Sequence, residues 1–134
     1  MTSIRKIEGV GDVYANKFRM VGITSVEALL KAGATPQGRE ELAQRSGISH
    51  ELILKWTNFA DLFRIKGVGE EYSELLEAAG VDTVVELAQR KPENLLEKMA
   101  AVNEKKKLVR RLPVQKQVAS WVAQAKKLPR VISY

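Results

Sequence analysis

Apolar residues recur at intervals of three and four along most of the chain, the spacing that places side chains on one face of an α-helix. The clearest stripe contains Leu52, Trp56, Phe59 and Phe63, and a second contains Val114, Val118, Trp121, Ala125 and Leu128. No segment of four or more residues alternates strictly between apolar and polar side chains, so we expect no β-sheet. The pattern predicts an all-α fold of eight or more short helices.

Capping residues mark several of the predicted helix boundaries. Gly22 and Gly80 each follow an apolar stretch and predict the end of a helix. Thr24 and Thr83 each stand three residues before a glutamate, the spacing of a capping box, and predict helix starts.

Two stretches of the chain, residues 7–23 and 65–81, match each other across a shift of 58 residues. Further along, Trp56 aligns with Trp121 at a shift of 65, so the second copy holds about seven extra residues, most naturally within 103–111. Such a repeat indicates a duplicated helical unit. We therefore expect one unit at 1–61 and another at 62–134, with the two tryptophan-bearing stripes meeting in one shared core.

Each copy begins with the same glycine motif, Gly9-Val10-Gly11 in the first and Gly67-Val68-Gly69 in the second. A chain that reverses between two helices in about three residues needs backbone angles that glycine adopts without steric cost, so we expect positive φ among these glycines. The valine between them should point into the core. The glycines also leave backbone N–H groups near the next helix N-terminus, an arrangement that suits a phosphate oxygen.

This pattern, with the tyrosine that follows it at Tyr14 and Tyr72, resembles the helix-hairpin-helix motif. A degenerate second hairpin at 42–49 resembles the paired motif of recombinase and DNA-repair proteins, and its counterpart at 108–114 lacks the glycine. The whole chain resembles an uncharacterised bacterial family of this length, a domain of unknown function built from duplicated units. The resemblance implies tandem helix-hairpin-helix units, similar to SAM domains, that hold the sugar-phosphate backbone without reading sequence.

Acidic residues follow both glycine motifs and oppose phosphate binding there. Asp12 follows the first motif, and Glu70 and Glu71 follow the second. Carboxylates in a first helical turn stabilise the helix end themselves and would compete with phosphate for the same donors. Lys66 favours an anion at the second motif, whereas Glu8 occupies that position in the first. The alternative is that both hairpins only connect packed helices.

Charge is distributed unevenly along this chain of net charge +6, because residues 105–134 carry nine basic side chains and no acidic one. Such a segment is a candidate surface for a polyanion, and its alternative role is a solvated helix face. If 105–111 is helical, Lys107 and Arg111 share one face, as do Lys106 and Arg110. The candidate phosphate-binding cluster, called the basic cluster below, consists of Lys105, Lys106, Lys107, Arg110, Arg111 and Lys116.

Other classes of function find little support in the sequence. There is no cysteine and only one histidine, His50, so we expect no metal site and no cofactor. No nucleophile is accompanied by a base and an orienting group, which argues against an enzyme. No apolar run is long enough to span a bilayer, and the N-terminus lacks the apolar core of a signal peptide, so we expect a cytoplasmic protein.

The function that these features favour is binding to duplex DNA, independent of sequence, through hairpin amides and the basic cluster. The alternative is a protein-interaction adaptor in which the acidic 62–104 region and the basic C-terminal segment meet a protein partner.

Overall fold

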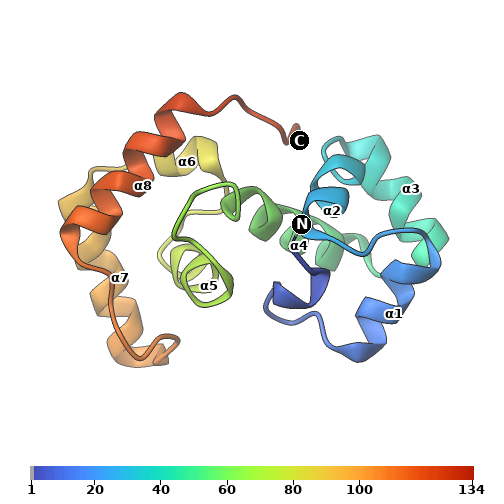
Figure 1. Cartoon of the computed structure of the whole chain (residues 1–134), viewed down its shortest axis with the longest axis horizontal. Helices are drawn as coiled ribbons and strands as arrows, with labels where there is room; N and C mark the ends of the chain where they lie inside the picture. Colours follow the sequence, from blue (N-terminus) through green and yellow to red (C-terminus); the bar gives the residue numbers. More distant parts are fainter. Residues whose placement is uncertain (1) are drawn as a thin grey trace. The chain divides into compact units, whose positions relative to one another are not determined.

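The computed structural model describes residues 2–134, and these residues form an all-helical fold (Figure 1). Within them we find no strand, only an isolated β-bridge between Ser3 and Ser25. The elements are η1 (Ile4–Lys6, a 3₁₀-helix), α1 (Asp12–Met20), α2 (Val26–Ala32), α3 (Pro36–Ser46), α4 (His50–Leu62), α5 (Glu70–Ala78), α6 (Val84–Ala88), α7 (Pro92–Lys106) and α8 (Gln115–Lys127). The all-α prediction is confirmed.

The chain divides into two compact units. Unit 1 contains the residues up to Asp61 together with Val131–Tyr134, and unit 2 contains Leu62–Arg130. The last four residues were expected in the second unit, and the structure corrects this assignment. The chain therefore leaves unit 1 after α4, forms unit 2, and ends again in unit 1.

The tail Val131–Tyr134 is held by a buried arginine of α3. The Arg39 guanidinium donates to the Ser133 carbonyl (2.9 Å) and to the Gly33 carbonyl (2.8 Å), and its pKa is lowered by desolvation. The Ser133 amide donates to the Ala34 carbonyl at 2.8 Å, and Ile132 is buried. These partners are distant in sequence, which explains why helical periodicity gave no sign of the tail's position.

Each tryptophan is buried among residues of its own unit. In unit 1, the ring of Trp56 meets those of Tyr14 and Phe18 edge to face, with centroids 4.9 and 5.8 Å apart. In unit 2, Trp121 belongs to an apolar cluster made only of residues between Leu62 and Leu128. The burial of both tryptophans is confirmed, but the single shared core is not.

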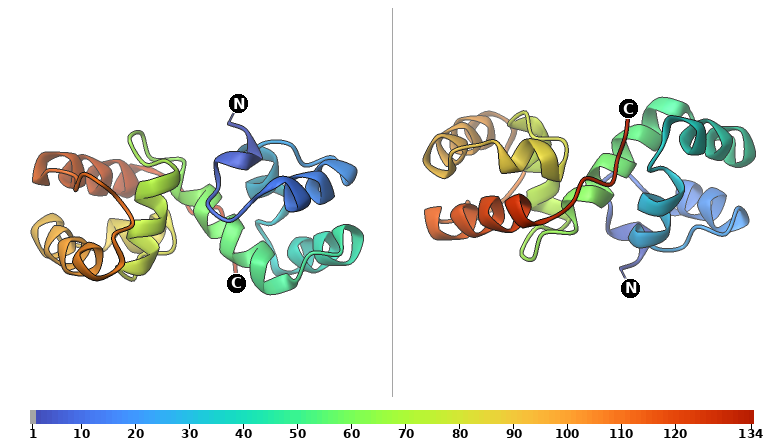
Figure 2. Two further views of the ribbon diagram at one scale, coloured as in Figure 1. Left: turned by 90° about the horizontal axis from the view of Figure 1, so that it is seen from below. Right: turned by 90° about the horizontal axis from the view of Figure 1, so that it is seen from above.

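Within unit 2, α8 packs against both α6 and α7, and α7 also contacts α5 (Figures 1 and 2). In this arrangement the side chain of Trp121, on α8, reaches the glycine motif that precedes α5. Trp56 of α4 occupies the corresponding place in unit 1.

The first glycine of each motif adopts the left-handed backbone conformation, as expected. The φ angle is +93° at Gly9 and +97° at Gly67. A Cβ atom at Gly9 would lie 3.2 Å from Nε1 of Trp56, and one at Gly67 would lie 2.9 Å from Nε1 of Trp121. Glycine is therefore required at both positions for its backbone freedom and for its small size.

The second glycine of each motif is an extended N-cap. Gly11 precedes α1 and Gly69 precedes α5, and neither has a side chain to cap the helix. Among the capping threonines, Thr83 is the N-cap of α6, but α2 is capped by Ser25 rather than by Thr24. The Thr24 carbonyl instead accepts from the Ile4 amide, which ties this segment to η1.

Replacing Gly67 with alanine should destabilise the protein by about 1–3 kcal/mol, because the new Cβ combines a strained positive φ with a clash against Trp121. Urea unfolding followed by circular dichroism measures the loss. Gly11→Ala is the matched control, since a Cβ there meets nothing within 4 Å. Equal losses in the two variants would contradict the close-contact explanation.

Deleting residues 131–134 should destabilise unit 1 selectively. The deletion exposes the surface that covers Ile132 and removes the Ser133 carbonyl from a buried guanidinium, and leaving a buried donor unpaired costs about 1–3 kcal/mol. Hydrogen exchange measured by mass spectrometry should show faster exchange in α2, α3 and α4 and unchanged exchange in α5 and α8. If the exchange rates in α2, α3 and α4 are the same with and without the deletion, the tail contributes nothing to the stability of unit 1.

Candidate nucleic-acid interface

The basic cluster surrounds the end of α7 and the loop that follows it. Helix α7 ends at Lys106, and Lys107 is its C-cap in the left-handed conformation (φ +52°). The Lys107 amide donates to the Asn103 carbonyl at 2.8 Å, which closes the helix. The conditional prediction of a helix over 105–111 is therefore wrong, and the shared helix faces that depended on it do not form.

Inward-facing and outward-facing side chains follow one another in pairs along the loop. The Asn103 side chain holds Val109 by two hydrogen bonds, donating to its carbonyl (3.1 Å) and accepting from its amide (3.0 Å). Val109 is buried, and Leu108 and Leu112 pack against the core. The loop is thereby fixed from inside, while the charged residues between these anchors are left in solvent.

All six members of the basic cluster are exposed. Within the part of the chain that the structure describes, none of them forms an ion pair with a carboxylate. Lys105 and Lys106 lie in the last turn of α7, Lys107 caps it, Arg110 and Arg111 lie in the loop, and Lys116 lies in the first turn of α8. Since the α7 end, the loop and the α8 start are consecutive, the structure gathers these charges around one anchored loop.

A tyrosine joins this loop to the first turn of α5. The Tyr72 hydroxyl donates to the Arg111 carbonyl at 3.0 Å. Because Tyr72 is the third residue of α5, the contact links the Arg111 backbone to a side chain of the first turn of α5.

The second glycine motif is held against α8 by a glutamine. The Gln124 side chain accepts from the Lys66 amide (2.9 Å) and donates to the Lys66 carbonyl (3.2 Å), and this leaves the Lys66 ammonium exposed. Val68 is buried as expected, but its amide donates to the Ile65 carbonyl and is not free for a ligand. The first turn of α5 offers further amide donors, beside the exposed Glu70 and Glu71.

The first glycine motif has a different setting. Val10 is buried, and the Val10 and Gly11 amides donate to backbone carbonyls of Ile7 and Gly9. Asp12, in the first turn of α1, forms an ion pair with Arg5. The connection after α3 is only Gly47–Ser49 and carries no basic residue. Of the two predicted hairpin sites, only that of unit 2 shares its unit with the basic cluster.

Three residues that organise this surface had been overlooked in the sequence: Asn103, Gln124 and, for its hydroxyl contact, Tyr72. Each acts through a hydrogen bond to the backbone, which has no signature in residue type or spacing. The only signal available was the extra length of the second copy between its two last helices. It predicted a longer loop but did not show which residues hold that loop in place.

Two structural searches bear on other functions. Among residues 2–134, no three or more His, Cys, Asp or Glu side chains gather as metal ligands would. Over the same residues, no helix is both long enough and apolar enough to cross a membrane.

Comparison with known proteins gives one match. No curated protein and no solved structure has a significant match to the chain. A family model described as "Domain of unknown function (DUF4332)" matches residues 8–128, which include all eight α-helices and both glycine motifs. The chain belongs to this family of unknown function.

Proposed function

We propose that this protein binds duplex DNA, independent of sequence, through the basic cluster of unit 2. The observation that carries the proposal is the hydrogen bond between Tyr72 and Arg111, because it joins the anchored basic loop to a side chain of the first turn of α5. Exposed cations, backbone donors and a fixed loop then belong to one surface. The resemblance of the glycine motifs to helix-hairpin-helix units supports the same class of ligand.

Phosphate contact by this surface relies mainly on charge. Each exposed Lys or Arg that neutralises a phosphate releases condensed counterions, which makes the affinity strongly dependent on salt. Contacts to phosphate position a protein on the duplex without reading bases, so the binding should be indifferent to sequence. Because Asn103 and Tyr72 already fix the loop, little backbone entropy is lost when DNA binds.

The glycine motif contributes less than the basic cluster. Amides of the first turn of α5 can donate to a phosphate oxygen, and Gly69 leaves them without a capping side chain. Glu70 and Glu71 lie in the same turn and repel a phosphate.

A protein-interaction adaptor is the second candidate, and the exposure of Glu70 and Glu71 is the observation that favours it. Adjacent acidic and basic groups on unit 2 would suit a protein partner whose surface also carries both signs. This candidate requires negligible DNA affinity at low salt, so one titration separates it from DNA binding.

Replacing both Arg110 and Arg111 with alanine should flatten the salt dependence of DNA binding. Each lost phosphate contact removes about 0.9 from the slope of log affinity against log salt, so the double variant should lose about 1.8. Fluorescence anisotropy with a labelled duplex and with a single strand, over a series of salt concentrations, measures the slope. Circular dichroism checks that the fold is kept.

The matched control is the double variant Lys126→Ala with Lys127→Ala, which removes the same charge from the exposed end of α8. It should change the slope by less than about half a unit, since these lysines lie a helix length from the basic loop. If the two double variants change the slope equally, DNA binding depends on the net charge of the protein and not on the basic cluster. No binding of duplex or single strand at about 50 mM salt would overturn the DNA proposal and favour the adaptor.

Replacing Gly69 with serine should make the protein slightly more stable and weaken its DNA binding. The backbone at Gly69 is extended and a Cβ there meets nothing within 4 Å, so a serine hydroxyl can cap α5. The cap stabilises by a few tenths of a kcal/mol and occupies the amides that a phosphate would use. Thermal unfolding and anisotropy measure the two effects.

Gly11→Ser makes the same change at the N-cap of α1 and serves as its control. Its stability should rise similarly while the DNA affinity stays unchanged, because the basic cluster lies in unit 2. If Gly69→Ser binds DNA as tightly as the unmodified protein, the α5 amides do not contact phosphate.

A further inference from the structure

A hollow of about 300 Å³ opens on unit 1 between η1, α1 and the segment before α2. Its floor is apolar and consists of the buried residues Ile4 and Ala15. Its rim is polar and consists of Ser3, Arg5, Asn16, Arg19 and Thr24. Most of the lining is polar, which suits a small charged ligand better than an apolar one.

Backbone hydrogen bonds hold the walls of this hollow in place. The Ile4 amide donates to the Thr24 carbonyl at 3.2 Å, and Ser3 forms a β-bridge with Ser25. The Arg5 amide donates to Oγ of Ser3 at 3.3 Å. The hollow is therefore formed before any ligand arrives, which lowers the entropy lost on binding.

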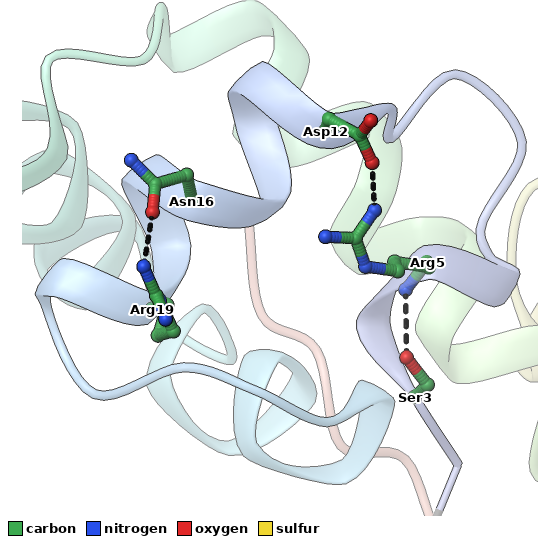
Figure 3. A network of polar contacts seen from close by, with 5 residues as sticks. All are labelled: Ser3, Arg5, Asp12, Asn16 and Arg19. Carbon is green, nitrogen blue, oxygen red and sulfur yellow. Dashed lines mark hydrogen bonds and ion pairs between the residues drawn. The ribbon is translucent and has the colours of Figure 1, made fainter.

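Two guanidinium groups flank the hollow (Figure 3). Arg5 reaches from η1 to the carboxylate of Asp12 on α1, and Arg19 donates to the amide oxygen of Asn16 at 2.6 Å. Each contact uses one nitrogen of its guanidinium. Since a guanidinium has five N–H donors, both arginines keep donors for a ligand while α1 fixes their positions.

The charge that lines the hollow is positive. None of its lining residues is acidic, and the carboxylate that pairs with Arg5 lies outside the lining on a side chain that is 90% exposed. A second hollow of unit 1 is different, because its single cation, Arg45, is accompanied by Glu41. Of these two hollows, the first alone combines two cations with no acidic lining residue.

The repeat in the sequence shows that these cations are not needed for the helical scaffold. At the shift of 58 residues, Arg5 aligns with Phe63, Asn16 with Glu74 and Arg19 with Glu77. Helix α5 nevertheless has the same length as α1 and begins 58 residues after it. The scaffold thus forms in unit 2 with Phe63 and Glu77 at the positions where unit 1 carries Arg5 and Arg19.

We propose that this hollow binds the phosphate group of a phosphate ester. Two arginines on separate elements can each donate to different oxygens of a tetrahedral phosphate, which offers more acceptors than a carboxylate. The hydroxyls of Ser3 and Thr24 add donors at the rim, and Ile4 and Ala15 contact the organic part. The volume corresponds to a ligand at the small end of the usual range.

The phosphate has two chemical sources, a free monoester and the backbone diester of a nucleic acid. The proposal goes beyond DNA binding by unit 2, because it concerns other residues in another unit. Phosphate binding in this hollow is therefore independent of Arg110 and Arg111, and the two proposals can fail separately.

The test is an NMR titration of the full chain, following backbone amides with inorganic phosphate, a nucleoside 5′-monophosphate and a short DNA duplex in parallel. Saturable shifts of the Ser3, Asn16 and Thr24 amides are expected, with a Kd of about 1 mM or lower for the mononucleotide. Tighter binding of the mononucleotide than of the duplex identifies a free monoester as the source. The reverse order identifies a nucleic-acid backbone, and either order supports a phosphate site.

Arg19→Gln should weaken this binding about tenfold or more, because it removes charge-assisted hydrogen bonds and keeps a polar side chain of similar length. Arg45→Gln is the matched control in the same unit and should leave the affinity unchanged. Thermal unfolding confirms that both variants fold. Absence of saturable shifts at about 10 mM phosphate or mononucleotide, or equal weakening by the two variants, would overturn the proposal.

Discussion

In each unit the backbone of a glycine lies against the indole nitrogen of a buried tryptophan, and this contact ties the hairpin to the last helix of the unit. Gly9 meets Trp56 of α4, and Gly67 meets Trp121 of α8. The tryptophan fills the core, so the glycine must lack a side chain, and its positive φ then sets the direction in which the next helix leaves. The position of α1 and α5, and therefore of every side chain that they carry, follows from this contact.

The loop between α7 and α8 exposes basic side chains, and hydrogen bonds from buried or half-buried side chains hold its backbone in place. Asn103 holds the backbone of Val109, and Tyr72 holds the carbonyl of Arg111. With the backbone fixed in this way, the side chains of Arg110 and Arg111 point into solvent. A loop of nearly the same charge without anchors would have to be ordered by its ligand, at a cost of about 1–2 kcal/mol for each residue fixed. The anchors convert a basic sequence into a surface of defined shape.

The two units use similar helices for opposite charge patterns. The face of α1 toward η1 carries Asn16 and Arg19, whereas the matching positions of α5 carry Glu74 and Glu77. Asn16 and Arg19 are exposed. Exposed side chains contribute little to folding, so the charge on this face of α1 can differ from that on α5 without loss of the scaffold. Unit 1 thereby gains a positive hollow, and unit 2 gains an acidic helix beside a basic loop.

The sequence alone determined the helical class, the burial of both tryptophans, the presence of positive φ among the four motif glycines, and the segment in which the basic residues gather. These features follow from local rules, namely helical periodicity, the steric freedom of glycine and the charge of consecutive residues. The tertiary structure alone decided that α7 ends at Lys106, that Tyr72 reaches Arg111, that Arg39 holds Ser133, and that Arg5 and Arg19 border one hollow. Each of these depends on side chains that meet across tens of residues of chain or between separate helices. Their meeting is set by how the helices pack, which residue spacing does not encode.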